Sequence, residues 1–322
     1  MGRLEDQLLL GDIGGTNARF ALFGDAGPGR IQSVQVSDYP NISAAIESLL
    51  ARHAGSARLS AILLATAGPV EGNRCELTNS AWVIDGAELR DRFELTYARV
   101  VNDFEAIAWS LPHLTASDLF GIGRGKAVWG TPAVVLGPGT GFGLAGIVHG
   151  PQGIIAVTTE GGHATLPSTS RREDEVIQHL RERYGHVSVE RVLSGPGLHN
   201  LYEAIGAVVG IAAPTRSAPE IMEAGRDGRC AVSRAALDMF CAVLGTVAGN
   251  VAVSFGARGG IYIAGGIVPR IVEYVTGSQF RDRFEAKGRF RTYLAPIPTY
   301  VIVHPDPAFV GLKSLMPREI SR

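Results

Sequence analysis

A glycine-rich turn near the N-terminus combines the residue types that bind a phosphate group. It lies in LLLGDIGGTNARF (residues 8–20) and contains Gly11, Asp12, Gly14, Gly15, Thr16 and Asn17. Glycines permit positive φ and remove Cβ atoms, so that successive backbone N–H groups can converge on an anion. A tight β-hairpin with bulges also favours glycine, but it gives Asp12 no task. Because no lysine lies in the turn, a bound phosphate would need Mg²⁺, which Asp12 would hold directly or through water.

The second half of the chain repeats this pattern. The segment AVVLGPGTGFGLAGI (residues 133–147) again has an apolar run, a glycine turn and a second apolar run, and its candidate phosphate-binding residues are Gly139, Thr140 and Gly141. Two similar turns, each with a threonine beside glycine, favour phosphate binding and indicate an internal duplication. The spacing G-x-G-x-x-G over residues 141–146 is interpreted as accidental, because it runs into a predicted strand rather than opening a helix.

Polar residues in the middle of the chain form a second constellation. Asn102 and Asp103 end a predicted strand, EGGHATLP (residues 160–167) follows another, and Glu190 begins a predicted short helix after Ser188. Sugar hydroxyls are donors and acceptors at once, and carboxylates together with amides satisfy both roles. Because burying such polar groups without a ligand costs free energy, their convergence would indicate a site.

Each of these residues also has a simpler interpretation. Asp103 could cap the helix that begins at Phe104. Glu160 could be a solvated loop residue, and His163 could be a core histidine with satisfied hydrogen bonds. Glu190 could do no more than favour a helix start electrostatically. The residue types alone leave these alternatives open.

Alternating strands and helices must position these residues. Apolar runs predict strands at 8–10, 18–23, 30–36, 59–65, 98–101, 154–159 and 261–264. Helical spacing predicts helices at 42–52, 104–110, 175–184, 189–193, 198–205, 234–255 and 308–316. This alternation predicts an α/β architecture. Because Asp238 and Asn250 interrupt the apolar stretch at 235–255, we expect a buried helix there rather than a membrane span.

Length and composition fit a two-domain globular protein. The chain has 322 residues, of which 46% are hydrophobic and 19% charged, and its net charge of −1 attracts neither nucleic acid nor an anionic membrane. The three cysteines lack C-x-x-C spacing, which weighs against disulfides and zinc. We expect a small α/β domain of residues 1–112 plus 305–322 and a large one of residues 113–304. No signal peptide is expected, so we predict a cytoplasmic protein.

Five segments together carry a resemblance to a known family. They are GDIGGTNARFAL, NDFEAIAWSLP, GPGTGFGLA, EGGHATLP and ERVLSGPG, and they span most of the chain. In this order they resemble bacterial glucokinases of the hexokinase type. More widely, the first turn, the strand end at Asn102, the second turn and IYIAGG (residues 261–266) resemble the phosphate 1, connecting, phosphate 2 and adenosine segments of the actin/Hsp70/sugar-kinase superfamily.

The resemblance implies a two-domain actin-like ATPase (ribonuclease H-like) fold with duplicated mixed sheets and an interdomain cleft. It also implies ATP-dependent phosphorylation of D-glucose at O6, the first step of glycolysis, with ATP and Mg²⁺ as cofactors and a homodimer as the assembly. Positions that match the family imply glucose contacts from Asn102, Asp103, Glu160, His163 and Glu190. They also imply nucleotide binding at Gly265 and Gly266. Asp103 is then the general base that accepts the proton of the sugar hydroxyl.

Three rival functions compete with this interpretation. A sugar-responsive repressor of the ROK type would add an N-terminal winged helix and a cysteine cluster, whereas Cys75, Cys230 and Cys241 are scattered. A chaperone or filament ATPase would leave the E-G-G-H segment unexplained. The serious alternative is a kinase for another hexose, such as mannose, or for an amino sugar.

Overall fold

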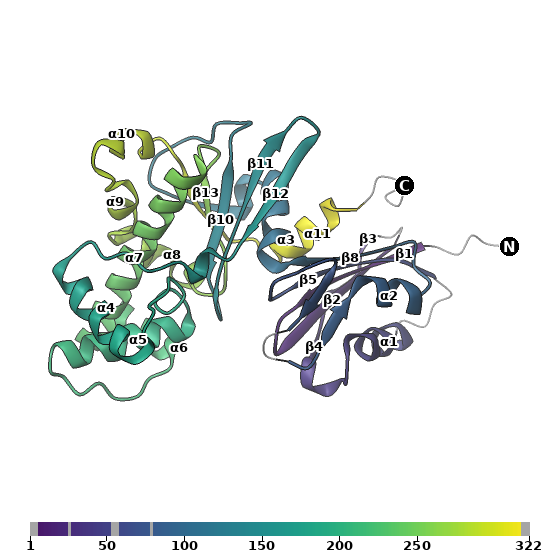
Figure 1. The fold of residues 1–322 in the computed structure, drawn as a ribbon, viewed down its shortest axis with the longest axis horizontal. Coiled ribbons are helices and arrows are strands. Elements are labelled where there is room, and N and C mark those ends of the chain that lie inside the picture. Colours follow the sequence, from purple (N-terminus) through teal and green to yellow (C-terminus); the bar gives the residue numbers. More distant parts are fainter. Residues whose placement is uncertain (1–5, 25–26, 53–57, 78–79, 317–322) are drawn as a thin grey trace. The chain divides into compact units, whose positions relative to one another are not determined.

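The chain divides into two compact units, each with its own sheet. The computed structural model describes residues 6–24, 27–52, 58–77 and 80–316. The first unit comprises residues 1–114 and 305–322, and the second comprises residues 115–304. In Figure 1 the yellow C-terminal helix α11 (Pro307–Ser314) therefore belongs with the purple and blue elements of the first unit.

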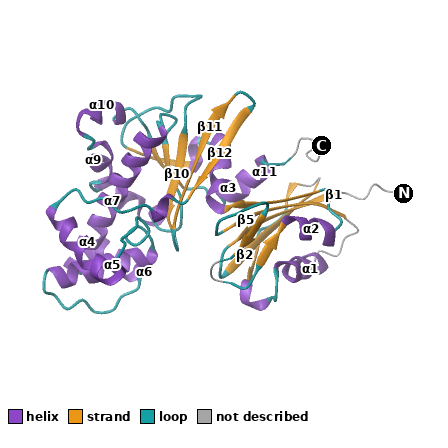
Figure 2. Ribbon diagram, viewed as in Figure 1, coloured by secondary structure: helices purple, strands orange, loops and turns teal. Residues whose placement is uncertain are grey.

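The first unit is a six-stranded sheet with helices on both faces (Figures 1 and 2). Its elements are β1 (Asp6–Ile13), β2 (Asn17–Gly24), β3 (Gly27–Pro28), β4 (Gln32–Gln35), α1 (Ile42–Arg52), β5 (Arg58–Thr66), β6 (Arg74–Glu76), β7 (Val83–Asp85), α2 (Gly86–Arg92), β8 (Tyr97–Asn102), α3 (Asp103–Ser110) and α11. The strand order is β3-β2-β1-β5-β8, with β4 paired to β2. Strand β1 is antiparallel to β2 and parallel to β5.

Side chains of β1 are buried alternately on the two faces of this sheet. Leu9 and Ile13 join a core cluster with α1, whereas Leu8 and Leu10 join another with α3 and α11. Helix α1 presents apolar residues at helical spacing, since Ile42, Ala45, Ile46 and Leu49 are all buried. A strand buried on both faces reads as a continuous apolar run, which explains the LLL sequence.

The second unit has a six-stranded sheet of order β12-β11-β10-β13-β14-β9. Its elements are β9 (Leu119–Ile122), β10 (Ala133–Pro138), β11 (Phe142–Gly150), β12 (Gly153–Thr159), α4 (Arg171–Tyr184), α5 (Gly195–Val208), α6 (Ala218–Arg226), α7 (Ala231–Phe255), β13 (Ile261–Ile263), α8 (Val272–Gly277), α9 (Phe280–Glu285), α10 (Arg291–Leu294) and β14 (Thr299–Ile302). Strand β10 is antiparallel to β11 and parallel to β13.

Helix α7 is the central helix of the second unit. It packs against β10 and against helices α5, α6 and α9. Its 25 residues are long and apolar enough to cross a membrane, but 78% of its most apolar window is buried inside the protein. The predicted buried helix is therefore confirmed, and its apolar character is explained by burial on nearly every side.

Both sheets use the same topology around a glycine turn. In each, an antiparallel hairpin (β1–β2 and β10–β11) is followed by two parallel strands next to its first strand (β5, β8 and β13, β14). The predicted internal duplication is thus present in the fold. Strand β11 runs on from the second turn for nine residues, so the G-x-G-x-x-G spacing opens no helix and is not a dinucleotide motif.

Candidate active site

The first glycine turn closes the β1–β2 hairpin. Gly14 N donates to Asn17 O at 2.9 Å, and Val36 N donates to Thr16 O at 2.9 Å. Thr16 and Asn17 are exposed at the tip of the turn. The turn is therefore anchored on both sides by backbone hydrogen bonds, and its polar side chains are accessible.

Gly11 and Gly14 serve close packing rather than a left-handed backbone. Gly11, Gly14 and Gly15 are absent from the described glycines that have positive φ. A Cβ at position 11 would lie 2.6 Å from Cδ2 of the buried Leu64, and one at position 14 would lie 3.3 Å from a carbonyl of the turn. At these two positions the chain requires glycine because it lacks a Cβ, and not because it permits a positive φ.

Asp12 is paired across the hairpin with an arginine that sequence analysis did not single out. Asp12 and Arg19 face each other in the antiparallel register, and their side chains form an ion pair. Arg19 Nη1 also lies 2.6 Å from Asp306 Oδ1, and the guanidinium carbon lies 5.6 Å from the centre of the Phe309 ring. Partial burial opposes the charge, but the two carboxylates raise the pKa of Arg19. The hairpin register could have identified Arg19, because it stands directly opposite Asp12.

Asn102 and Asp103 mark the junction of β8 and α3. Asn102 is the N-cap, since its Oδ1 accepts from Phe104 N at 2.9 Å and from Glu105 N at 3.2 Å. Its Nδ2 donates to Gly68 O at 3.1 Å. Asp103 is the first residue of the helix, and its Oδ1 accepts from Phe104 N at 2.8 Å. The N-cap is therefore Asn102, and Asp103 adds a second side-chain acceptor for the amide of Phe104.

These candidate residues of the first unit lie at one edge of its sheet. The parallel strands β1, β5 and β8 end together, with Ile13 beside Thr66 and Thr66 beside Asn102. Thr66 Oγ1 donates to Val101 O at 3.3 Å and so ties two of these strand ends together. Strand spacing places the Asn102 end about 10 Å from the Ile13 end. Ligands of open α/β sheets bind at this carboxyl edge.

The second glycine turn contacts the carboxylate of Glu190. Gly139 N donates to Gly141 O at 2.8 Å, which closes the turn around the exposed Thr140. Phe142 N donates to Glu190 Oε2 at 2.8 Å. A Cβ at position 141 would lie 2.5 Å from that oxygen, whereas a Cβ at position 139 would meet nothing within 4 Å. Glycine at position 141 therefore admits the carboxylate of Glu190 to the turn.

The E-G-G-H loop lies next to the same carboxylate-bearing segment. Glu190 N donates to Gly162 O at 2.9 Å. Glu160 Oε2 and His163 Nε2 are 3.8 Å apart, and their side chains are 64% and 63% exposed. The interpretation of His163 as a core histidine is therefore wrong, and both side chains are free to meet a ligand at the surface of the second unit.

The predicted short helix at 189–193 is absent. Leu193 N donates to Val189 O at 2.7 Å, but the segment makes only a single turn. Ser194 ends it by capping the next helix, because its Oγ accepts from Gly197 N at 2.9 Å. Glu190 thus lies in a turn and not at the start of a helix. The interpretation that it favours a helix start electrostatically is therefore wrong.

Gly265 and Gly266 follow β13 and adjoin the strand that leads into the second turn. Ala264 N donates to Leu136 O at 2.9 Å. Gly265 has a φ of 89°, and a Cβ there would lie 2.9 Å from the carbonyl carbon of Pro138. Gly266 has open space where a Cβ would be, with nothing within 4 Å. The second unit therefore gathers the second turn, the E-G-G-H loop, Glu190 and this glycine pair.

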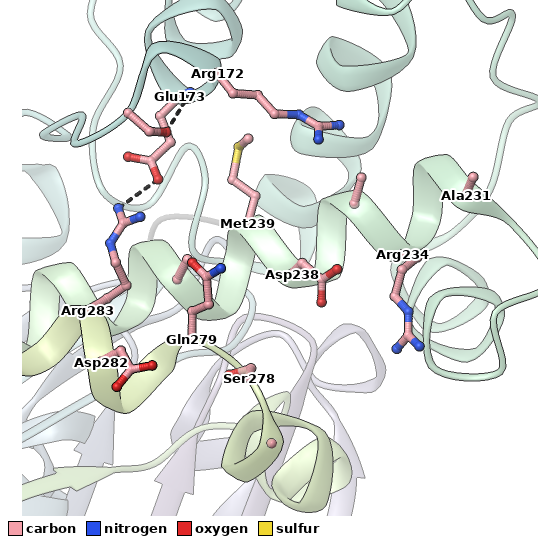
Figure 3. Close-up of a pocket in the computed structure, with 14 residues that line it drawn as sticks. Arg172, Glu173, Ala231, Arg234, Asp238, Met239, Ser278, Gln279, Asp282 and Arg283 are labelled. Atoms are coloured by element: carbon pink, nitrogen blue, oxygen red, sulfur yellow. Dashed lines mark hydrogen bonds and ion pairs between the residues drawn. The ribbon is translucent and has the colours of Figure 1, made fainter.

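A cavity of about 760 Å³ lies elsewhere in the second unit, between the start of α4, α7 and residues 277–283 (Figure 3). None of the candidate residues lines it. Its buried carboxylate, Glu173, accepts from Arg283 Nη2 at 2.7 Å and from Thr169 N at 2.8 Å. Figure 3 shows the guanidinium of Arg283 directed at the carboxylate of Glu173, and both side chains line the cavity. These charges neutralise each other, which indicates a structural ion pair.

The described residues fit a magnesium ion held mainly by a substrate. Within the described ranges, no three His, Cys, Asp or Glu side chains gather as a metal site would require. Mg²⁺ is commonly held by one or two carboxylates together with phosphate oxygens and water. Asp12, at the end of β1 and beside the turn, is a candidate carboxylate for this arrangement, and a bound ion would compete with its ion pair to Arg19.

This chain is similar to known glucokinases over nearly its whole length. The sequence model described as Glucokinase matches residues 9–319. The glucokinase of Paramagnetospirillum magneticum is 47% identical over 315 residues, which are 97% of this chain and 98% of that protein. The bifunctional protein glk of Burkholderia pseudomallei is 43% identical over 318 residues. This chain spans about half the length of that protein, because the match covers 97% of this chain and 49% of the relative.

A solved structure with the same fold is also a glucokinase. The crystal structure of glucokinase from an Antarctic psychrotroph matches with a TM-score of 0.86 and 34% identity, over 96% of this chain and 98% of that one. The predicted α/β class of the actin-like ATPase type, with a mixed sheet in each unit, is thereby confirmed. The family model, the relatives and the fold agree over nearly the whole length: the chain belongs to the glucokinase family.

Proposed function

We propose that this chain transfers the γ-phosphoryl group of ATP to O6 of D-glucose with Asp103 as the general base. Phosphorylation of glucose by ATP follows from membership of the glucokinase family. The assignment of residues to the steps is the proposal. It rests above all on the position of Asp103, directly after the N-cap residue Asn102 at the carboxyl edge of the first sheet.

The backbone around Asp103 supports its assignment as base. Asn102 fixes the start of α3 through two hydrogen bonds to backbone amides and one to Gly68 O. A primary hydroxyl is a poor nucleophile, and a carboxylate within hydrogen-bond reach accepts its proton as the phosphoryl group transfers. The helix cap therefore fixes the backbone from which the Asp103 side chain projects.

We assign the nucleotide to the two turns and to the glycine pair after β13. Backbone amides and threonine hydroxyls of these segments would contact the phosphates. The residues are Gly11, Asp12, Gly14, Gly15, Thr16, Asn17, Gly139, Thr140, Gly141, Gly265 and Gly266. Asp12 would hold Mg²⁺, directly or through water, and that ion would neutralise charge on the phosphates. Arg19 lies beside the turn, where its charge is paired with Asp12 and Asp306.

We assign glucose to five side chains that offer both donors and acceptors. They are Asn102, Asp103, Glu160, His163 and Glu190. Glucose hydroxyls donate to the carboxylates and accept from the amide and the imidazole. The exposure of Glu160 and His163 supports this assignment, because neither is committed to the core. A homodimer and a cytoplasmic location stay predictions.

Substitution of Asp103 by asparagine tests the base directly. We expect kcat for glucose phosphorylation to fall roughly 10²-fold or more, the usual loss for a general base, while the glucose Kd changes far less. Asp91→Asn is the matched control, because the Asp91 side chain is 77% exposed on α2 of the same unit. A kcat for Asp103→Asn within twofold of wild type would remove Asp103 from this role.

An ADP-release assay distinguishes the rival substrates. Release of ADP from Mg-ATP is followed with glucose, mannose, glucosamine and no sugar. We expect the highest kcat/KM with glucose and slow hydrolysis without sugar, because the hydroxyl and not water is the intended acceptor. A higher kcat/KM with mannose or glucosamine would identify the alternative kinase, and rapid hydrolysis without sugar would contradict the proposal altogether.

A further inference from the structure

The Glu190 carboxylate connects two parts of the second unit that the proposed function treats separately. Oε2 accepts the hydrogen bond of Phe142 N, the first amide after the second glycine turn. Within the described residues no other protein group hydrogen-bonds to this side chain, which is partly exposed. A carboxylate offers about four lone-pair sites. Glu190 therefore has acceptor capacity for a ligand while it holds the turn.

The backbone of Glu190 is fixed from both sides. Its N–H donates to Gly162 O at 2.9 Å, and its carbonyl accepts from Ser194 Oγ at 2.8 Å. Gly195 N, at the start of α5, donates to Gly139 O at 2.9 Å. Hydrogen bonds, together with the peptide bond between Ser194 and Gly195, thus connect the E-G-G-H loop through Glu190 to both ends of the second turn. A displacement of the carboxylate would break its hydrogen bond to the amide of Phe142.

Glycine at position 141 makes this contact possible. A methyl group there would come within 2.5 Å of Glu190 Oε2, nearer than such atoms pack. Gly277, in α8 of the same unit, lies outside the proposed binding residues, and a methyl group there would meet nothing within 4 Å. Of these two glycines, only the one at position 141 would gain a methyl group that pushes the carboxylate away.

We propose that Glu190 is a positioning residue that couples sugar binding to nucleotide binding through the Phe142 amide. The inference deepens the proposed function and rests on its assignment of Glu190 to glucose. A glucose hydroxyl that donates to the carboxylate holds Glu190 in place, and Glu190 in turn holds the turn in the conformation that receives phosphate. Hydrogen bonds of this charged kind are the strong ones, and linked chains of them reinforce one another.

The coupling is reciprocal and can be measured as a ratio of dissociation constants. Glucose should tighten the binding of Mg-AMPPNP, a non-hydrolysable ATP analogue, and the analogue should tighten glucose by the same factor. Couplings of this kind amount to roughly 5- to 150-fold. We expect the wild-type protein to lie in this range in calorimetric titrations of each ligand with and without the other.

Gly141→Ala is the decisive variant and Gly277→Ala is its control. In Gly141→Ala we expect the Kd for glucose to weaken at least tenfold in the absence of nucleotide, and the coupling factor to fall below about twofold. In Gly277→Ala we expect the nucleotide-free Kd for glucose to stay within twofold of wild type, and the coupling to be retained. Gly141→Ala with the glucose Kd and coupling of wild type would overturn the inference.

Variants of Glu190 separate coupling from a simple sugar contact. If Glu190 only bound sugar, Glu190→Ala would leave the Kd for Mg-AMPPNP unchanged when no sugar is present. We expect that Kd to weaken several-fold, because the turn loses its anchor. Glu190→Gln keeps an acceptor oxygen for Phe142 N and should restore part of the sugar-free nucleotide affinity. An unchanged nucleotide Kd in Glu190→Ala would refute the anchoring role.

The outcomes also separate this inference from the proposed function. A wild-type chain that binds neither glucose nor Mg-AMPPNP would defeat the proposed function. If the wild-type chain binds both ligands, and Gly141→Ala and Glu190→Ala bind them as the wild type does, only the coupling is refuted. Thermal melting of each variant shows whether it is folded, and if Gly141→Ala fails to fold, the comparison of Glu190→Gln with Glu190→Ala decides the question.

Discussion

Substitution of Gly311 by alanine should reveal how the returning C-terminal segment supports the proposed base. Gly311 lies in α11, at the contact with α3, the helix that begins with Asp103. A Cβ at position 311 would lie 2.8 Å from the carbonyl carbon of Ala106, nearer still to its oxygen, and 3.0 Å from Ser110 N. The added methyl group would overlap backbone atoms of α3, and backbone cannot turn aside as a flexible side chain can.

The magnitude follows from the separation that the two helices would need. Carbon atoms pack at about 3.5–4.0 Å and the Ala106 oxygen lies nearer than its carbon, so α11 and α3 must move apart by more than about 1 Å. That shift opens the packed cluster in which Leu312 is 0% and Phe309 is 5% exposed. Overpacking of this kind costs roughly 1–3 kcal/mol of unfolding free energy. For a domain of this size the melting temperature should fall by roughly 5–10 °C.

The activity of the same variant shows which helix moves. If α3 is displaced, Asp103 moves with it, and a misplacement of about 1 Å can lower kcat on the order of 10²-fold. If α11 is displaced instead, the unfolding free energy falls and kcat stays close to that of the wild type. Gly277→Ala is the matched control, because a Cβ on that helical glycine would meet nothing within 4 Å. Calorimetric melting that places Gly311→Ala level with the control would refute the close packing of α3 and α11.

Two further predictions concern the thiols and alkaline pH. Partial burial would raise the pKa of Cys230, but hydrogen bonds from Ser233 lower it, whereas burial raises the pKa of Cys75 and Cys241. We therefore expect a disulfide-exchange dye to label Cys230 first in the folded protein and the other two only after unfolding, and equal labelling rates would contradict this. Burial also raises the pKa of Cys241 to about 12 and of Tyr262 to about 12, so the folded state keeps protons that the unfolded state loses. Urea titrations should then show an unfolding free energy that falls as the pH rises from about 9 toward 12, and a flat profile would exclude the effect.

Sequence analysis predicted the elements whose signal is local. The buried strand at 59–65 and the helix at 42–52 were recognised because apolar spacing marks them directly. The two turns were recognised because their glycines are clustered and repeated. Short elements that depend on tertiary neighbours, such as β14 at Thr299–Ile302 and helix α9, carried no such signal. Strand β14 exists because β13 and β9 pair with it from distant parts of the chain.

The misjudged details of the site share a physical cause. Residues 189–193 have helical spacing, yet Ser194 begins a new helix before a second turn can form. A helix of one turn has few internal hydrogen bonds, so tertiary contacts decide its shape. Arg19 was overlooked because its partner lies across a hairpin and not beside it in the sequence. In both cases the deciding contact joins residues that a local pattern does not relate.

The two glycine hairpins show how one backbone can serve two chemical tasks. At the strand position where the first hairpin has Asp12, opposite Arg19, the second has Gly137, opposite Gly143. A Cβ at position 137 would overlap the carbonyl of Ala264, just before the Gly265 turn. Asp12 therefore gives the first hairpin a charge at this position. Gly137, at the same position of the second hairpin, allows the backbone at Ala264 to approach closely. The acid that the second hairpin lacks comes from Glu190, outside the repeat, so the shared glycines define the shape of each turn and the residues that differ define its chemistry.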